Sequence, residues 1–212
     1  MVWILIFLCA YFIGSIPSGY LVAKSQGLDI RQHGSKNIGA TNVLRVMGKK
    51  WGYTVFFCDA FKGFFSVKIG WSLAAAFGAN VTWGALLAGL ACIVGHNYTI
   101  WLGFKGGKGI ATSSGVLIAF FPALIVLLMG LVWIGVFYFG RFVSLASISA
   151  AVALPIAVAL LGPFTGVQDY WVALGFSILI AALAVWRHRT NIERLMKGTE
   201  SRFASKTKPV GS

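Results

Sequence analysis

From residue 122 to residue 141 the sequence reads PALIVLLMGLVWIGVFYFGR, with no charged residue before the arginine at its end. Apolar side chains surround this helix on all sides, unlike the one-sided stripe of a surface helix in a soluble protein. A helix of about 20 apolar residues spans a hydrocarbon core of about 30 Å. We therefore expect a membrane helix that begins after Pro122 and runs to about Phe139.

Six more apolar runs flank this one, in a chain that is 58% hydrophobic with a mean hydropathy of +0.82. They predict helices over residues 2–23, 51–77, 81–101, 110–121, 142–161 and 170–186. Pro17 and its small neighbours should bend the first helix and let another helix approach closely. The chain is thus predicted to be one all-α integral membrane domain, residues 1–212, with about seven transmembrane helices. The division of residues 110–140 around Pro122 is the open point.

The net charge of +13, from 18 Lys plus Arg against 5 Asp plus Glu, is of the kind seen in nucleic-acid-binding proteins. Here, however, the cations stand at the ends of the apolar runs, as the positive-inside rule requires. Seven helices place 16 of the 18 cations on one side, at residues 24, 31, 36, 45, 49, 50, 105, 108, 141, 187, 189, 194, 197, 202, 206 and 208. We expect no nucleic-acid partner, the N-terminus outside, and the basic loops and C-terminus in the cytoplasm.

The cysteines and carboxylates offer no metal or redox centre in this sequence. Cys9, Cys58 and Cys92 all lie inside apolar runs, and they are typical of small buried side chains. The five carboxylates are scattered, so we predict no metal site and no cofactor. Asp59 and Lys62 lie three residues apart, share one face of the helix over 51–77, and are expected to form a structural ion pair. The alternative is that Asp59 acts in catalysis.

The segment Gly103-Phe-Lys-Gly-Gly-Lys-Gly109 precedes a predicted helix and is the most distinctive polar motif. Glycines let the backbone approach a ligand closely, and the free N–H groups at a helix start attract anions. Lys105 and Lys108 add positive charge. The segment therefore predicts a phosphate site, although its spacing is not that of a Walker A loop. The alternative is a flexible loop that is basic only for topology.

Two further polar stretches lie on the same predicted side of the membrane. In the first loop Ser35, Asn37 and Asn42 can form hydrogen bonds, and Arg45 offers a bidentate fork for phosphate. The alternative is an ordinary polar turn with a helix cap. His96 lies just before the glycine-rich segment and is a functional candidate, or else a packed histidine. The basic stretch 187–194 is either functional or a helix end that holds lipid headgroups.

Several of these motifs together resemble the bacterial acyl-phosphate:glycerol-3-phosphate acyltransferases, the PlsY family. The matching pieces occur in the family's order and span nearly the whole chain: residues 14–21, 34–45, 59–63, 95–97 with 104–109, 141–145 and 187–192. The resemblance implies an inner-membrane enzyme that moves a fatty acyl group from acyl phosphate to the 1-hydroxyl of sn-glycerol 3-phosphate. The product would be lysophosphatidic acid, and the active site would face the cytoplasm. Membrane lipid and the enzyme that supplies acyl phosphate are the expected partners.

On this resemblance, the residues expected to act in catalysis are Ser35, Arg45, His96 and Lys105. Those expected to bind substrate phosphate are Lys36, Asn37, Asn42, Gly106, Gly107, Lys108, Gly109, Thr112, Ser144, His188 and Asn191. Because acyl phosphate is already activated, the substrate hydroxyl is expected to attack it directly. Its proton would pass to His96, to His188 or to a phosphate oxygen.

A transporter of a small phosphorylated anion is the leading alternative from another class. Transporters often show internal repeats and ionisable groups near the membrane midplane. No repeat is evident here, and the polar motifs gather on one side. A structural lipid-binding protein would leave the glycine-rich segment unexplained, so the enzyme is the preferred interpretation.

Overall fold

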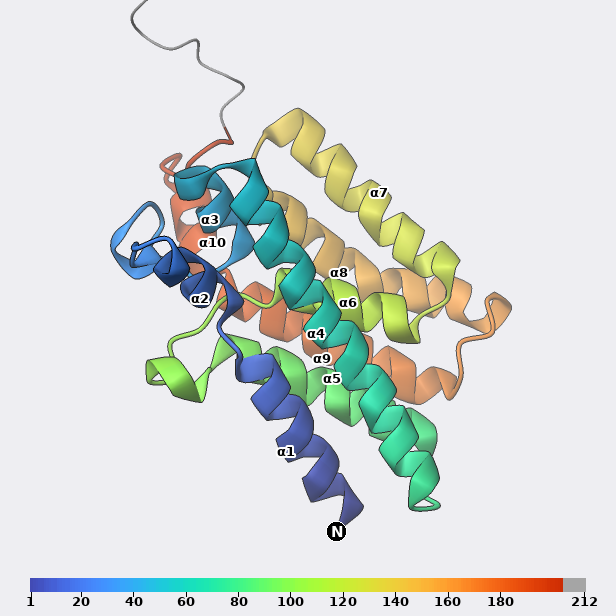
Figure 1. Cartoon of the computed structure of the whole chain (residues 1–212). Coiled ribbons are helices and arrows are strands. Elements are labelled where there is room, and N and C mark those ends of the chain that lie inside the picture. Colours follow the sequence, from blue (N-terminus) through green and yellow to red (C-terminus); the bar gives the residue numbers. More distant parts are fainter. Residues whose placement is uncertain (204–212) are drawn as a thin grey trace, which may run out of the picture.

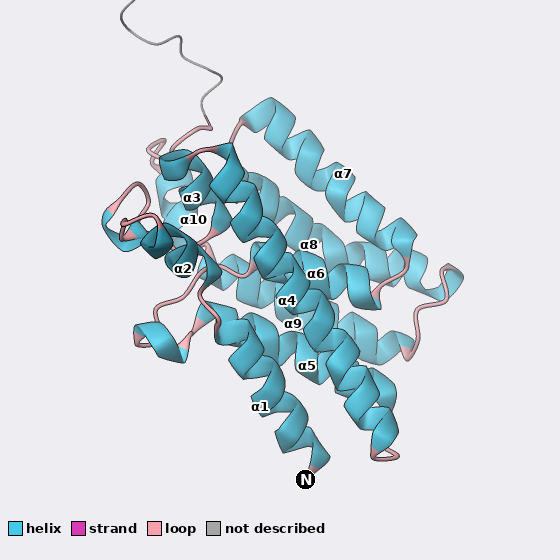
Figure 2. Cartoon of the chain, in the orientation of Figure 1, coloured by secondary structure: helices cyan, strands magenta, loops and turns pink. Residues whose placement is uncertain are grey.

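The computed structural model describes residues 1–203, and within them every regular element is a helix (Figures 1 and 2). The α-helices are α1 Val2–Ser15, α2 Ser18–Ser25, α3 Ala40–Met47, α4 Lys49–Ala76, α5 Val81–Asn97, α6 Ile110–Phe120, α7 Ala123–Gly140, α8 Val143–Leu161, α9 Tyr170–Arg187 and α10 Arg189–Met196. Three short 3-10 turns cover Ile30–Gln32, Ile100–Leu102 and Gly162–Phe164. The predicted all-α class is confirmed. The basic residues Lys206 and Lys208 lie outside the described part.

Five segments of the described chain are long and apolar enough to cross a membrane: Val2–Ser25, Val81–Leu102, Ala123–Gly140, Val143–Phe164 and Tyr170–Arg187. Helix α4 has 28 residues but carries Asp59, Lys62 and Lys68. Helix α6 has 11 residues, which is about 17 Å of helix and too short for a core of about 30 Å. The membrane class is therefore supported, while the count of seven spans and the orientation remain predictions.

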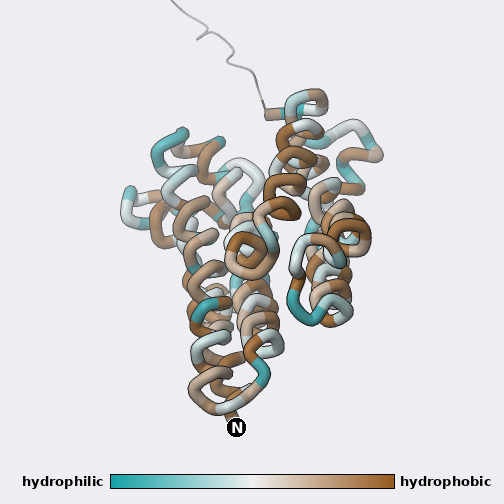
Figure 3. The backbone as a smooth tube through the Cα atoms, turned by 90° about the vertical axis from the view of Figure 1, so that its right-hand side faces the viewer, coloured by the Kyte–Doolittle hydropathy of each residue, from teal (hydrophilic) through white to brown (hydrophobic). Residues whose placement is uncertain are grey.

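The outer surface is strongly apolar. On α7, Leu127, Leu131 and Ile134 are all about two-thirds exposed, at 64%, 66% and 59%. Figure 3 shows brown, hydrophobic stretches along most of the helices. Soluble monomers rarely expose a continuous apolar surface of this kind, whereas a lipid-facing protein requires one.

The predicted first helix is two helices, because the chain breaks at Ile16 and Pro17. Proline has no backbone N–H and therefore interrupts the hydrogen bonds of a helix. The freed carbonyls have partners: Thr99 Oγ1 donates to Ser15 O at 2.5 Å, and Lys62 Nζ donates to Ile16 O at 2.9 Å. Such pairing is required because an unsatisfied backbone group inside a membrane costs several kcal/mol.

The expected close helix approach is present between α1 and α5. A Cβ added to Gly14 would collide with the carbonyl of Cys92, and one added to Gly95 would collide with the carbonyl of Tyr11. Small residues let helix backbones touch in this way. The prediction for the residues around Pro17 is thus confirmed, except that the chain breaks where only a bend was expected.

The predicted polar loop over 24–50 is wrong in one respect, because it contains helix α3. This helix packs its apolar face on a small core made by Ala23, Ile30, Ile38, Val43 and Val55. The tail also contains a helix, α10. Figure 1 shows α2, α3 and α10 together at the end of the molecule away from the N-terminus.

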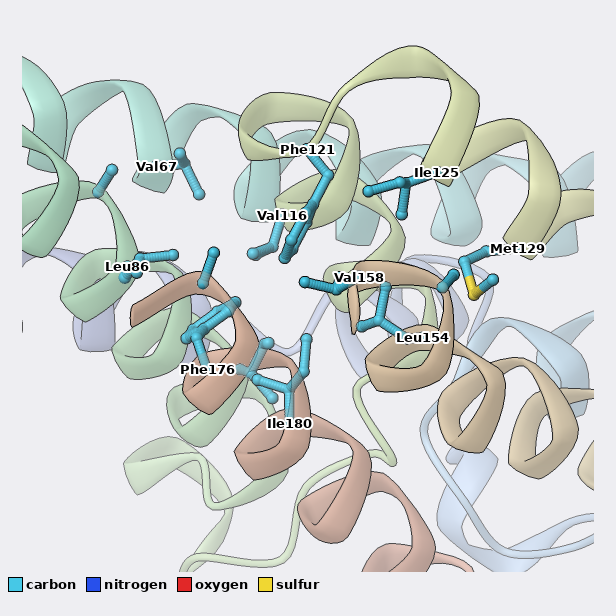
Figure 4. Close-up of a cluster of buried hydrophobic side chains, with 14 residues drawn as sticks. Val67, Leu86, Val116, Phe121, Ile125, Met129, Leu154, Val158, Phe176 and Ile180 are labelled. Atoms are coloured by element: carbon cyan, nitrogen blue, oxygen red, sulfur yellow. The ribbon is translucent and has the colours of Figure 1, made fainter. Parts of the chain in front are cut away.

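The helices form two groups that share one core. Helices α1, α4, α5 and α6 pack together, and α7, α8 and α9 pack in sequence order. The core between them takes Val67 from α4, Val116 from α6, Ile125 from α7, Val158 from α8 and Phe176 from α9 (Figure 4). This common core holds the end of α5, the start of α8 and the end of α9 in fixed relative positions.

Candidate active site

The glycine loop, residues 103–109, folds back against the end of α5. The N–H of Gly106 donates to Asn97 O at 3.2 Å, and the N–H of Gly107 donates to His96 O at 3.1 Å. A Cβ on Gly106 would collide with the His96 carbonyl, and one on Gly107 would collide with His96 Nε2. These two glycines are therefore required by close packing, and their N–H groups are engaged within the chain.

Helix α6 starts directly after the loop with a free N-terminus. Its N-cap, Gly109, has a left-handed backbone with φ +80° and offers no side chain to the first turn. A Cβ there would also lie 2.7 Å from Asn97 Oδ1. The side-chain amide of Asn97 and the hydroxyl of Thr112 are buried without a hydrogen-bond partner among the described residues. The first turn of α6 thus remains the part of the motif that can receive an anion.

Arg187, at the end of α9, holds the loop from the outside. Its Nη2 donates to Gly107 O at 2.7 Å and to Gly106 O at 3.2 Å. The guanidinium also lies 4.9 Å from the centre of the Tyr98 ring, a cation–π geometry. The sequence pointed to a basic stretch here but did not predict that Arg187 would bind the glycine loop.

Three predicted residues from distant parts of the chain meet around Glu200. Lys108 Nζ donates to Asn191 Oδ1 at 2.6 Å, and Asn191 Nδ2 donates to Glu200 Oε1 at 2.7 Å. Ser144 Oγ donates to the same Glu200 oxygen at 2.6 Å. Arg194 Nε pairs with Glu200 Oε2 at 2.7 Å. We call Lys108, Ser144, Asn191, Arg194 and Glu200 the Glu200 cluster.

Burial is the largest cause that lowers the pKa of Lys108 to about 8. The Glu200 carboxylate opposes this shift. Repulsion from three nearby guanidinium groups adds to it, those of Arg45, Arg187 and Arg194. An anion bound beside Lys108 would favour its charged form and relieve this repulsion.

Glu200 compensates part of this positive charge. Burial works against its ionised form, but hydrogen bonds from Ser144, Arg194 and Asn191 hold the pKa of Glu200 below its usual range. The carboxylate therefore stays ionised at neutral pH and orients its donors. Sequence reasoning missed Glu200, since an isolated acidic residue in a basic tail gives no local signal.

His188 lies at the junction of α9 and α10 beside Lys108. Burial first, and then the Lys108 charge, lower the pKa of His188 to about 4. Its Nδ1 lies 2.8 Å from Ala184 O. Since a carbonyl only accepts, we assign the proton to Nδ1, which leaves the Nε2 lone pair free.

The first loop is organised around one buried side chain, Asn42. Its Nδ2 donates to His33 O at 3.0 Å and to Asn37 O at 2.9 Å, and its Oδ1 accepts from Ser35 N at 2.8 Å. Asn37 Oδ1 accepts from Gly39 N just before α3. The polar-turn alternative thus describes Asn42 and Asn37 in this structure, and their phosphate contacts remain a prediction. The other candidates here are exposed, namely Ser35, Lys36 and Arg45.

His96 is buried and bonded away from the site. Lys62 Nζ lies 2.9 Å from His96 Nδ1 and 2.8 Å from Asp59 Oδ1, so the predicted Asp59–Lys62 ion pair is present. An ammonium group can only donate, so Nδ1 is the acceptor and the ring proton sits on Nε2. A neutral His96 therefore has no free lone pair, which argues against the predicted role as a base.

The family model for glycerol-3-phosphate acyltransferase matches residues 4–198. A glycerol-3-phosphate acyltransferase of Aquifex aeolicus is 45% identical over 195 residues, which is 92% of this chain and 95% of that protein. One of Desulforudis audaxviator is 45% identical over 202 residues, which is 95% of this chain and 96% of that protein.

The chain belongs to the glycerol-3-phosphate acyltransferase family. Two solved structures of PlsY, an integral membrane glycerol 3-phosphate acyltransferase, are also similar to it. Each is 40% identical and covers 96% of both chains, with a TM-score of 0.84 for the glycerol 3-phosphate form and 0.82 for the lysophosphatidic acid form. The resemblance found in the sequence is confirmed.

In this member of the glycerol-3-phosphate acyltransferase family, the predicted residues lie in several places at one end of the molecule. Lys108, Ser144, His188 and Asn191 meet around Glu200. Ser35, Lys36 and Arg45 lie on the loop and helix that face this end, and Arg45 is near enough to affect the charge of Lys108. His96, Gly106 and Gly107 form the packed base beneath, Gly109 and Thr112 lie at the start of α6, and Lys105 is exposed.

Proposed function

We propose that this chain transfers a fatty acyl group from acyl phosphate to the 1-hydroxyl of sn-glycerol 3-phosphate. The products would be lysophosphatidic acid and inorganic phosphate. The observation that carries the proposal is the partly buried Lys108 ammonium, which lies near enough to the guanidinium groups of Arg45, Arg187 and Arg194 to be repelled by them, at one end of an apolar helical bundle. Both substrates carry phosphate, and clustered cations bind phosphate through strong charge-assisted hydrogen bonds.

An apolar groove supports a donor with a long acyl chain. This groove is shallow and open to the outside, and most of its lining residues, among them Leu131, Val136 and Phe139, belong to α7. Its end at Leu145 adjoins Ser144, whose hydroxyl belongs to the Glu200 cluster. A fatty chain in this groove would place its activated carbonyl near the cations.

The proposed reaction is a direct acyl transfer. The glycerol hydroxyl oxygen forms a bond to the carbonyl carbon, and the bond from that carbon to the phosphate oxygen breaks. Phosphate leaves with the electron pair. Lys108, Arg45, Lys105 and the first turn of α6 would stabilise the developing negative charge and align the two substrates.

The hydroxyl proton would go to a phosphate oxygen of a substrate. His96 offers no lone pair, because Lys62 occupies Nδ1 and Nε2 carries the proton. His188 has a free Nε2, but a pKa of about 4 makes it a weak base near neutral pH. A phosphate monoester has a second pKa of about 6 and suits the task better. Ser35 would then orient glycerol 3-phosphate, the acceptor of the acyl group.

The decisive experiment uses the purified protein in detergent with acyl phosphate and labelled glycerol 3-phosphate. Formation of labelled lysophosphatidic acid supports the proposal. The same protein in liposomes, without a donor, should not accumulate glycerol 3-phosphate. Uptake without product would instead identify the transporter.

We further propose a bacterial inner-membrane location with this site facing the cytoplasm, where an enzyme that makes acyl phosphate would supply the donor.

A further inference from the structure

A single buried lysine joins three parts of the chain beneath the glycine loop. Lys62 Nζ donates to Ile16 O at 2.9 Å, lies 2.8 Å from Asp59 Oδ1 and lies 2.9 Å from His96 Nδ1. The first and the last of these contacts are hydrogen bonds, and the contact with Asp59 is an ion pair, since Asp59 Oδ1 has no hydrogen-bond partner among the described residues. We call Lys62, Asp59, His96 and the Ile16 carbonyl the Lys62 cluster.

The cluster is fully closed. Lys62 is 7% exposed, His96 5% and Asp59 1%. His96 Nδ1 and Asp59 Oδ1 are 3.6 Å apart, too far for a hydrogen bond, so the two acceptors are joined only through the lysine. Charges inside a membrane protein are costly and usually mark a function.

The position of His96 decides where the glycine loop lies. Its ring lies against Gly107 closely enough that any Cβ would collide with Nε2, and its carbonyl accepts the Gly107 N–H. Lys108 follows directly, and it carries the charge proposed to meet the substrates. A rotation of the imidazole would therefore move the loop beneath that charge.

We propose that Lys62 is a positioning residue for the acyl transfer, a step that rests on the proposed function. By donating to Nδ1 it holds His96 as the Nε2–H tautomer, and the ring supports Gly107 and Lys108. By donating to Ile16 O it ties the same support to the break between α1 and α2. The ion pair with Asp59 holds the ammonium in place.

Lys68 on the same helix provides a matched control. Its ammonium is exposed, donates to Ala119 O at 3.3 Å and lies 5.6 Å from the centre of the Phe64 ring. It thus meets the C-terminal end of α6 and has no contact with the glycine loop. Lys68→Met should leave both kinetic constants within about twofold of wild type.

The first test replaces each ring nitrogen separately. His96→Asn keeps an acceptor near the position of Nδ1, whereas His96→Gln keeps a polar group nearer Nε2 and removes the acceptor for Lys62. We expect His96→Asn to retain kcat within about tenfold, and His96→Gln to lose about 100-fold in kcat/KM, the scale of a small misplacement. If His96→Asn is as inactive as His96→Ala at unchanged thermal stability, His96 acts directly in the chemistry and the proposal fails.

The second test removes both charges together, since a lone Asp59 would be left unpaired in the single variant. Asp59→Asn with Lys62→Met should accumulate and raise KM for glycerol 3-phosphate at least about tenfold. Wild-type kcat and KM would show that the pair is merely structural and would overturn the proposal. If this variant does not accumulate, the His96 pair still decides.

A third measurement needs no activity. Nitrogen-15 NMR of histidine-labelled protein in micelles reports the tautomer of each ring, and the chain has 3 His. We expect the Nε2–H form for His96, identified by its loss in His96→Asn. An Nδ1–H form would overturn the positioning proposal. That result would not touch the proposed function, which fails only if the wild-type protein makes no lysophosphatidic acid.

Discussion

The Lys62 cluster is a buried polar network and the Glu200 cluster is a partly buried one, and the two are built in opposite ways. In the Lys62 cluster one ammonium donates to the Ile16 carbonyl and to His96 Nδ1, and it forms an ion pair with the Asp59 carboxylate. In the Glu200 cluster a single carboxylate stands among Lys108 and several arginines, and burial with repulsion lowers the pKa of Lys108 to about 8. The Lys62 cluster, whose groups contact one another, can fix the position of the neighbouring backbone. The Glu200 cluster has more cationic donors than carboxylate acceptors, so it is suited to binding an anion.

The two histidines repeat this contrast. His96 accepts through Nδ1 and directs its protonated edge at the glycine loop, whereas His188 donates through Nδ1 to Ala184 O and keeps Nε2 unprotonated. From the sequence we expected His96 to act in catalysis and His188 to bind substrate phosphate. The comparison predicts that changes at the Glu200 cluster affect substrate binding most, and that changes beneath the glycine loop affect stability as well.

The largest effect is expected from Lys108→Met. Loss of a charged partner from a desolvated pair typically costs about 2–5 kcal/mol, so kcat/KM should fall at least about 30-fold. Steady-state kinetics in detergent would measure it, with Lys68→Met as the control. A fall of less than threefold would mean that Lys108 does not meet a substrate phosphate.

Gly107→Ala tests the packing of the glycine loop against the His96 ring. The added Cβ must displace the His96 ring, and overpacking of this kind costs about 1–3 kcal/mol of unfolding free energy. We expect a lower midpoint of thermal unfolding together with a raised KM for glycerol 3-phosphate. Gly175→Ala on α9, where a Cβ meets nothing within 4 Å, is the control. Equal stability of both variants would contradict the packing described here.

Arg45→Lys tests whether the exposed guanidinium acts as a fork. Lysine keeps the charge but loses one of two parallel hydrogen bonds, each worth about 1.5–3 kcal/mol when made to a charged group. Activity should drop about 10-fold or more at unchanged stability. An Arg45→Lys enzyme with wild-type kinetics would leave Arg45 as a topology charge only.

The pH dependence should follow Lys108. Because burial and neighbouring arginines depress its pKa, the side chain is charged below about pH 8 and loses its charge as pH rises through that value. The KM for glycerol 3-phosphate should therefore rise above about pH 8. In Lys108→Arg this alkaline rise should move to higher pH, since arginine stays protonated. A KM that is flat from pH 7 to 10 would exclude Lys108 as a binding charge.

The smallest expected effect is that of chelation. The proposed chemistry uses cationic side chains where other enzymes use a metal, so EDTA should leave the rate unchanged. Acyl-CoA should not replace acyl phosphate as the donor. If the rate is lost on chelation and restored by a divalent cation, a metal ion takes part in the reaction and the cationic side chains alone do not account for it.

Much of the fold followed from local sequence. Long uncharged runs require a hydrocarbon environment wherever they lie, so the membrane class and most helix limits were predictable. The break at Pro17 and the helix over residues 40–47 were not, because both depend on partners elsewhere. Thr99 and Lys62 satisfy the broken ladder, and Val55 helps to bury α3.

The same distinction between local sequence and contacts with distant residues applies to the candidate site. The pattern of the sequence marked the glycines and Lys108 as a phosphate site, and the family resemblance added Ser144 and Asn191. Only the tertiary structure decided which of them meet, because Lys108 and Asn191 are 83 residues apart and Ser144 and Glu200 are 56 apart. It also decided that His96 supports the loop and that Glu200 organises the cations. Proton positions and charge depend on burial and on neighbours, and these arise only when distant helices pack together.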